Sequence, residues 1–317
     1  MKKTWYLIIG VVLLVIGCIA YGYHEHHKPK TAQELKTVRV AYLPITHALP
    51  VFATKELETA DGPVHVELVK YGSWPELMDA LNTGKVDAAS VLVELGVKAR
   101  EQGIDVRAAA LGHTEGNIII VNKDINSVQD LKGKSFAIPH KQSTQKILVD
   151  CMLEQAGLSE KDVQIVEMSP PEMPSALSVG QIAGYSVAEP FGSLALEMGT
   201  GKVFEDPDHL WYDNICCALV FNGQFVDEHH DLAKAFTKAY LDAGTYLDEH
   251  PKAQEEISSK YMKFNDSVIE RSLKVIGFKD LALTEDRYNA LVHHMTHIDL
   301  IKKVPTYSEF VDTSLLP

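Results

Sequence analysis

Short hydrophobic runs recur along the chain with two alternating periods, and these periods predict strands and helices in turn. The stretch 37–44, TVRVAYLP, alternates apolar and polar side chains as a strand does. A helical pattern follows at 45–57, and a second alternating run, VHVELVKYG, occupies 64–72. Regular alternation of strands and helices is typical of a mainly parallel sheet covered by helices, so we expect an α/β fold.

The segment Ser73-Trp74-Pro75-Glu76 predicts where the next helix begins. Ser73 is a capping residue, Pro75 is tolerated in a first helical turn, and Glu76 takes the reciprocal capping-box position. Gly84 is expected to end this helix. Further strands are expected at 86–92, 106–111 and 117–122.

The same alternation restarts after residue 122 and gives way to helices in the C-terminal part of the chain. We therefore predict two lobes: residues 37–122 and 214–317 form lobe I with the C-terminal helices, and residues 123–213 form lobe II. A strand near 215–221 would return from lobe II to the first sheet. Two crossings between lobes create a hinge, and the cleft between lobes is a favoured ligand site.

A strand–proline–helix corner near residue 189 is the most suggestive feature of lobe II. The segment 185–188 is expected to be a strand, and Pro190 is tolerated at the start of the helix that follows. Glu189 then lies at the carboxyl end of a strand, where open α/β sheets bind ligands. The alternative is that Glu189 is a solvated residue in an ordinary loop.

The first 36 residues have the composition of an export signal followed by a tether. Two lysines precede an uncharged run at 4–23, and Val15-Ile16-Gly17-Cys18 resembles a bacterial lipobox. We expect residues 1–17 to be a signal peptide, Cys18 to be lipidated, and residues 18–36 to be a flexible tether. The alternative is an uncleaved signal anchor, since the apolar run is long enough to span a bilayer. Either arrangement leaves a large domain outside the cytoplasm, attached to the membrane.

Charge and motif content exclude two classes of protein. The net charge of −13 leaves no basic stripe for a nucleic acid, so no nucleic-acid partner is expected. No G-x-S-x-G elbow occurs, and Gly133-Lys134-Ser135 lacks the earlier glycine of a phosphate-binding loop. Since no set of catalytic residues is visible, we expect a binding protein rather than an enzyme.

The histidines and cysteines show no spacing that predicts a metal site or a cofactor. His24, His26 and His27 lie in the tether, and His293 and His297 lack the glutamate of a helical zinc motif. The cysteines contain no C-x-x-C pattern, and Cys216-Cys217 falls in an apolar run, ICCALVF, that is expected to be a strand. We therefore expect neither a metal nor a cofactor.

Polar residues at strand ends and helix starts are the candidate ligand-binding residues. Helix amino termini that face a cleft offer free N–H groups to a ligand. The alternative is that the serine and threonine hydroxyls only cap their helices. The candidates are Thr46, His47, Ser73, Trp74, His113, Glu115 and Asn117 in lobe I, and Thr144 and Glu189 in lobe II.

Four segments of the chain are similar to one family of binding proteins. They are AYLPITHALP, GSWPELMDALNTGKVDAA, DLKGKSFAIP and SPPEMPSALSVGQIAGYSVAEPFG. Their order and spacing resemble the periplasmic-type binding proteins of the nitrate/sulfonate/taurine ABC importer group. The resemblance implies a two-lobed type II periplasmic-binding-protein fold with a helical C-terminal portion, a small-molecule ligand between the lobes, and an ABC permease as partner.

The resemblance also implies roles for individual residues. It places Trp74, the Glu115–Asn117 turn and Thr144-Gln145 in the cleft. The chain departs from the nitrate-binding branch at Gln145, where that branch has a histidine, and at Ile215-Cys216, where it has a lysine. Without these cations, and with two glutamates nearby, a bare anion is disfavoured. A zwitterion such as taurine, an aminated heterocycle such as a thiamine-precursor pyrimidine, or an anion held with a metal ion fits better.

These features predict a lipid-anchored receptor on the outer face of a bacterial cell membrane. It would deliver a small polar solute, a sulfonate-, taurine- or nitrate-like anion or zwitterion, to an ABC importer. One alternative is a thiamine-pyrimidine synthase-like protein, although that family carries a CCCFC-like motif and this chain has only Cys216-Cys217. The other is a sensor domain on a signal anchor.

Overall fold

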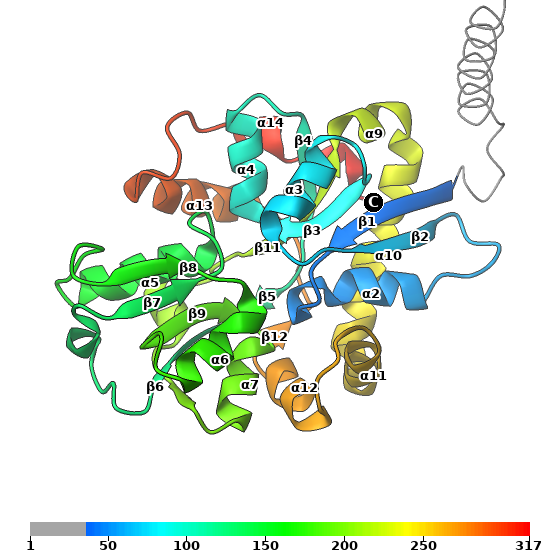
Figure 1. The fold of residues 1–317 in the computed structure, drawn as a ribbon. Coiled ribbons are helices and arrows are strands. Elements are labelled where there is room, and N and C mark those ends of the chain that lie inside the picture. The colour runs from blue at the N-terminus through cyan, green and yellow to red at the C-terminus, as the bar shows by residue number, and fades with distance from the viewer. Residues whose placement is uncertain (1–35) are drawn as a thin grey trace, which may run out of the picture. The chain divides into compact units, whose positions relative to one another are not determined.

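The computed structural model describes residues 36–317, of which 38–317 form one compact unit. The expected signal peptide, Cys18 and nearly all of the expected tether lie outside the described residues. Among the residues described, none of the helices is both long enough and apolar enough to cross a bilayer. The unit contains two five-stranded sheets, and Figure 1 shows them as separate groups of arrows, blue to cyan and green.

The first sheet has the strand order β2-β1-β3-β11-β4 and defines lobe I. Its strands are β1 (Thr37–Tyr42), β2 (His65–Lys70), β3 (Ala88–Leu92), β4 (Val106–Leu111) and β11 (Cys217–Asn222). β1 runs parallel to β3, whereas β11 is antiparallel to both β3 and β4. The late strand β11 therefore returns to the first sheet, as its apolar sequence predicts.

The second sheet has the strand order β10-β6-β9-β7-β8 and defines lobe II. Its strands are β6 (Asn117–Asn122), β7 (Ser135–Ile138), β8 (Gln164–Glu167), β9 (Gly184–Ala188) and β10 (Gly201–Val203). β6 pairs with β9 and β10, so its residues lie in lobe II, whereas the sequence analysis assigned them to lobe I. The continuous apolar run of β6 predicts a strand but does not indicate which sheet the strand joins.

Helices cover both sheets, and several begin where the sequence predicts. In lobe I they are α2 (Leu49–Glu56), α3 (Trp74–Asn82) and α4 (Val93–Glu101); in lobe II they are α5 (Thr144–Gln155), α6 (Met173–Ser178), α7 (Phe191–Glu197) and α8 (Pro207–Leu210). Ser143 caps α5 by accepting a hydrogen bond from the Lys146 N–H. Ser73 is the N-cap residue of α3, but its side chain makes no capping hydrogen bond.

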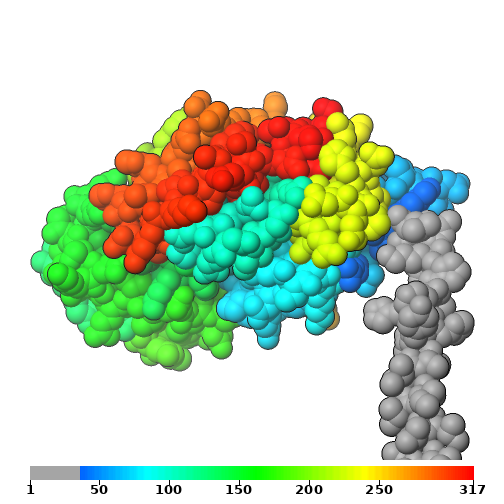
Figure 2. Space-filling model, turned by 90° about the horizontal axis from the view of Figure 1, so that it is seen from above, coloured from blue at the N-terminus to red at the C-terminus, as the bar shows by residue number. Residues whose placement is uncertain are grey.

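The C-terminal third is helical, as expected. Its helices are α9 (Gly223–Glu228), α10 (His230–Glu249), α11 (Pro251–Tyr261), α12 (Asp266–Leu273), α13 (Glu285–His297) and α14 (Tyr307–Phe310). Figure 2 shows the orange and red C-terminal segments lying across the green lobe II and the cyan and yellow parts of lobe I. One contact of this kind joins His297 Nε2 of α13 to the Glu154 carboxylate of α5 at 3.0 Å.

Two short elements connect the lobes. The chain leaves β4 and passes through β5 (Thr114–Glu115), which pairs with β12 (Ile276–Gly277), before it enters β6. Glu115 and Gly116 both have a positive φ, of 58° and 81°, so the chain turns sharply here. This turn brings the end of the first sheet against the start of the second.

Candidate functional site

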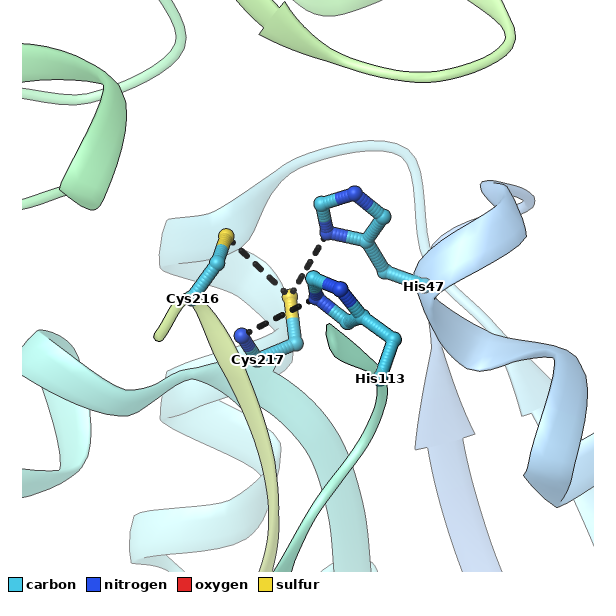
Figure 3. Close-up of side chains that lie close together, drawn as sticks. All are labelled: His47, His113, Cys216 and Cys217. Atoms are coloured by element: carbon cyan, nitrogen blue, oxygen red, sulfur yellow. Dashed lines mark hydrogen bonds between the residues drawn. The ribbon is translucent and has the colours of Figure 1, made fainter. Parts of the chain in front are cut away.

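Two histidines and two cysteines meet where lobe I faces lobe II. His47, His113, Cys216 and Cys217 are all buried, and one potential ligand atom from each lies within 4.8 Å of those of the others. Figure 3 shows the four side chains converging from three separate segments of the chain. We call these four residues the His/Cys cluster.

Sheet pairing explains why residues so distant in sequence meet. His47 lies in a short 3-10 turn, Thr46–Ala48, directly before α2, and His113 follows β4 by two residues. Because β11 is antiparallel to β4, the start of β11 lies beside the end of β4, and the Gly112 N–H donates to the Cys217 carbonyl at 2.8 Å. Cys216 and Cys217 are thereby placed next to His113.

Two of the distances between donor atoms match those around one tetrahedral metal ion. Cys216 Sγ and Cys217 Sγ are 3.8 Å apart, and Cys217 Sγ is 3.6 Å from His47 Nδ1. Zinc bonds of about 2.3 Å to sulfur and about 2.0–2.1 Å to nitrogen give tetrahedral edges of about 3.8 Å and 3.6 Å. Tetrahedral sites of two sulfur and two nitrogen donors are typical of zinc.

Backbone carbonyls fix the tautomers of both histidines. His47 Nε2 lies 3.0 Å from the Gly116 carbonyl oxygen, and His113 Nδ1 lies 2.7 Å from that of Glu115. A carbonyl only accepts, so each of these ring nitrogens carries the proton. The other ring nitrogens then carry the lone pairs: His47 Nδ1 lies 3.6 Å from Cys217 Sγ, whereas His113 Nε2 accepts from the Cys217 N–H at 3.4 Å. Hydrogen bonds from the second ring nitrogen to a carbonyl are typical of metal-binding histidines.

The charge states of the cluster also suit a cation. Burial, together with the nearby His47, lowers the pKa of His113 to about 4, so its imidazole is neutral near pH 7. Burial opposes ionisation of Cys216, but the Cys217 thiol and the two histidines outweigh it and hold the pKa of Cys216 well below its usual value. Burial and the Cys216 thiolate raise the pKa of Cys217. A neutral imidazole, such as that of His113, and a thiolate are forms that bind metals.

At position 116, where the lobes meet, the surrounding atoms leave room only for glycine. A Cβ atom at this position would lie 2.8 Å from Ile276 Cδ1 and 3.0 Å from His47 Nε2. Its carbonyl accepts from the Glu189 N–H of lobe II at 3.1 Å as well as from His47. The turn predicted at 115–117 therefore contacts the cluster through two carbonyl groups, that of Glu115 beside His113 and that of Gly116 beside His47.

The helix start at Thr144 and Gln145 lies directly against the cluster. Gln145 Nε2 donates to Cys216 Sγ at 3.3 Å and to Asn117 Oδ1 at 2.7 Å. Thr144 Oγ1 contacts the Ile215 carbonyl at 2.6 Å and the Glu94 carboxyl at 2.5 Å. Three predicted residues, Asn117, Thr144 and Gln145, therefore lie in one network around Cys216.

Glu94, which the sequence analysis did not single out, is held as a neutral acid in this network. The Thr144 hydroxyl has one proton and gives it to the Ile215 carbonyl, so Glu94 must donate in the second contact. Burial, and next the charge of the Cys216 thiolate, raise the pKa of Glu94 well above its usual value, in agreement with this proton count.

The remaining predicted residues lie in other surroundings. The Glu189 carboxylate accepts from the Ser193 N–H and hydroxyl at 2.9 Å each, so it holds the start of α7, while its carbonyl accepts from Thr46. Glu115 lines a pocket of about 540 Å³ together with Asp206 and Asp208, and Gly116 and Asn117 line the same pocket. Ser73 and Trp74 begin α3 and contribute no donor to the His/Cys cluster.

Residues 31–261 match the NMT1-like family. The chain belongs to this family. It is also 35% identical to a ligand-binding component of an ABC-type import system from Staphylococcus aureus, whose structure was solved with zinc bound. The alignment covers 88% of this chain and 97% of that one, with a TM-score of 0.84.

Several relatives of this NMT1-like protein are solute-binding proteins. It is 29% identical over 285 residues to a putative aliphatic sulfonates-binding protein of Bacillus subtilis, covering 86% of this chain and 82% of that protein. It is also 29% identical over 212 residues to the taurine-binding periplasmic protein of Escherichia coli, covering 65% of each. Some matches are longer proteins: the chain spans 36% of a nitrate import ATP-binding protein of Synechocystis.

The periplasmic-binding-protein fold expected from the resemblance is confirmed. The nitrate-binding protein of Synechocystis superposes with a TM-score of 0.79 over 90% of this chain, at 18% identity. The expected family is confirmed as well, since the relatives of this NMT1-like protein include sulfonate-, taurine- and nitrate-binding proteins. These relatives bind different solutes, so the solute of this chain must be argued from its own residues.

Proposed function

We propose that this NMT1-like protein is the solute-binding component of an ABC importer. Its solute is a thiophilic transition-metal ion such as zinc. The observation that carries the proposal is the His/Cys cluster, whose four donors lie within 4.8 Å of one another at the boundary between the lobes. The zinc in the relative from Staphylococcus aureus supports it.

The donor set favours this class of ion over others. Thiolate and imidazole bind zinc and its neighbours, whereas magnesium and calcium prefer oxygen donors. Four protein donors complete a tetrahedral zinc site, while catalytic zinc sites keep one position open for water or substrate. The cluster is therefore suited to holding an ion rather than to catalysis.

The same site is poorly suited to the sulfonate-, taurine- or nitrate-like solutes that the resemblance implies. The side chain that contacts the cluster, that of Gln145, is a neutral amide, and the pKa of Cys216 is held well below its usual value, which favours a thiolate. An anionic head group would be repelled by that sulfur unless a cation came with it. We therefore use taurine, a sulfonate and nitrate as competing solutes in the test below.

The location of the protein is part of the proposal. The apolar run at 4–23 and the lipobox-like Val15-Ile16-Gly17-Cys18 support export and a lipid anchor at Cys18. A receptor tethered in this way on the outer face of a bacterial membrane would pass its ion to an ABC permease. Mass spectrometry of the mature amino terminus tests this part, since an intact Met1 would contradict it.

Calorimetric titration of the purified, metal-free chain tests the choice of solute. We expect one zinc ion per chain with a Kd below 1 μM, or a binding free energy beyond about −8 kcal/mol, and much weaker binding of magnesium. Taurine, ethanesulfonate and nitrate, each titrated without metal, are expected to give no comparable heat. Tight binding of any of these three to a chain that does not bind zinc would contradict the proposal.

A further inference from the structure

All four donors of the His/Cys cluster come from the lobe I side of the boundary, so the cluster alone does not explain how lobe II responds to a bound ion. His47 follows β1, His113 follows β4, and Cys216 and Cys217 begin β11, and these strands all belong to the first sheet. A ligand closes a two-lobed protein only if it binds the closed form more tightly than the open one. An ion held by lobe I donors alone must therefore be detected by lobe II through one of its ligands.

The contact between Gln145 and Cys216 meets this requirement. Gln145 lies in the first turn of α5 in lobe II, is 1% exposed, and directs Nε2 to Cys216 Sγ at 3.3 Å. The contact joins lobe II to a sulfur atom of the cluster.

A chain of amide groups determines which end of Gln145 faces the sulfur. Asn214 Nδ2 donates to the Asp208 carboxylate at 2.8 Å and to the Trp211 carbonyl at 3.3 Å, and the carbonyl can only accept. Asn214 Oδ1 must then accept from Asn117 Nδ2, at 3.0 Å. Asn117 Oδ1 in turn accepts from Gln145 Nε2, at 2.7 Å.

The consequence is that Gln145 offers an N–H to the Cys216 sulfur. Its two amide protons go to Asn117 and Cys216, and its Oε1 atom is buried with no hydrogen-bond partner among the described residues. A thiolate is a much better acceptor for this N–H than a neutral thiol, because hydrogen bonds to charged groups are the stronger ones. The network is therefore arranged for a sulfur that has lost its proton, as a metal-bound cysteine has.

We propose that Gln145 is the positioning residue through which lobe II detects the bound metal ion, by donating to the metal-bound sulfur of Cys216. This inference rests on the proposed function, since it takes the ion in the cluster to be the solute. The ion fixes the position of the Cys216 sulfur that it ligates, and Gln145 of lobe II can donate to that sulfur only when the lobes are closed. Metal binding then favours closure although no residue of lobe II ligates the metal.

Gln145→Met tests the inference, because methionine has a similar length and no donor. The variant is expected to bind one zinc ion with an affinity about 10- to 100-fold weaker, the usual effect of losing a partner of a metal ligand. The decrease in radius of gyration that zinc causes in the wild type, measured by small-angle X-ray scattering, should be lost. With Co²⁺ as probe, the sulfur-to-cobalt charge-transfer band should shift, which a change in folding alone would not produce.

Gln155→Met is the matched control, because Gln155 ends the same helix and is exposed. It should bind zinc and contract as the wild type does. Gln145→Glu is a second variant of unchanged size that replaces the donor by an acceptor, and it should also fail to contract.

The outcomes distinguish a failure of the inference from a failure of the proposed function on which it rests. A wild-type chain that binds no zinc overturns both. A wild-type chain that binds zinc without contracting, or a folded Gln145 variant that contracts as the wild type does, overturns the inference alone.

Discussion

Replacing both cysteines of the cluster, Cys216→Ser with Cys217→Ser, is expected to abolish zinc binding at micromolar metal concentrations. Serine has nearly the same shape as cysteine, but its hydroxyl keeps its proton near neutral pH and is a poor ligand for a thiophilic ion. The two remaining histidines, His47 and His113, provide half of a tetrahedral site. Competition with a chromophoric chelator measures the affinity, and circular dichroism checks that the variant is folded.

Cys151→Ser is the control for the loss of a thiol. Cys151 lies in α5, is half-buried and is not part of the cluster, and burial raises its pKa to about 11, so it is a neutral thiol. Its replacement should leave the zinc affinity unchanged. If the double variant kept the affinity of the wild type, the cluster would not be the zinc site.

Gly116→Ala is expected to have the second largest effect, on both stability and metal affinity. The residue has a φ of 81°, and a Cβ atom would lie 2.8 Å from Ile276 Cδ1 and 3.0 Å from His47 Nε2. Left-handed backbone costs alanine about 1–2 kcal/mol, and an overpacked contact adds about 1–3 kcal/mol. We expect the free energy of unfolding to fall by about 2–5 kcal/mol and zinc to bind about 10- to 100-fold more weakly, because His47 loses its carbonyl partner.

Gly103→Ala separates the backbone cost from the clash. Gly103 has a φ of 82°, and a Cβ atom there would meet nothing within 4 Å. Urea unfolding of the metal-free variants should show a loss of about 1–2 kcal/mol for Gly103→Ala, with unchanged zinc affinity. Equal losses of stability in the two variants, together with normal zinc binding by Gly116→Ala, would contradict the role given to the Glu115–Gly116 turn.

The fold was largely predictable because its signals are local. The alternation in 37–44 and 64–72 gives β1 and β2, and Ser73-Trp74-Pro75 marks the first turn of α3. The apolar run ICCALVF predicts β11, which returns to the first sheet. The sheet to which β6 belongs was not predictable, because a strand next to a lobe crossing has the same residue pattern in either sheet.

The candidate site was predictable only in part. Strand ends and helix starts meet at the boundary between lobes in such folds, and for this reason His47, His113, Asn117 and Thr144 were found from the sequence pattern, whereas Gln145 came from the family resemblance. The structure places His47 and His113 in the His/Cys cluster, Gln145 in contact with it through Cys216, and Asn117 and Thr144 in the hydrogen-bond network beside it. Their roles in binding a solute stay predictions.

The cysteines were missed because their partners are distant in sequence. Positions 47, 113, 216 and 217 have no motif spacing, and only the pairing of β11 with β4 brings them together. The sequence nevertheless contained a signal for the cluster. Two adjacent cysteines begin a strand that returns to the first sheet, and two histidines follow strands that are expected in the same sheet. Glu94 carried no signal, since its neutral state depends on Thr144 and on burial.

Zinc K-edge X-ray absorption spectroscopy of the chain loaded with one equivalent of zinc tests the central claim most directly. Our account predicts a four-coordinate ion with two sulfur neighbours at about 2.3 Å and two nitrogen neighbours at about 2.0–2.1 Å. In the Cys216→Ser, Cys217→Ser variant the sulfur shell should be absent. A wild-type spectrum with only nitrogen and oxygen neighbours would contradict the assignment of the solute site to His47, His113, Cys216 and Cys217.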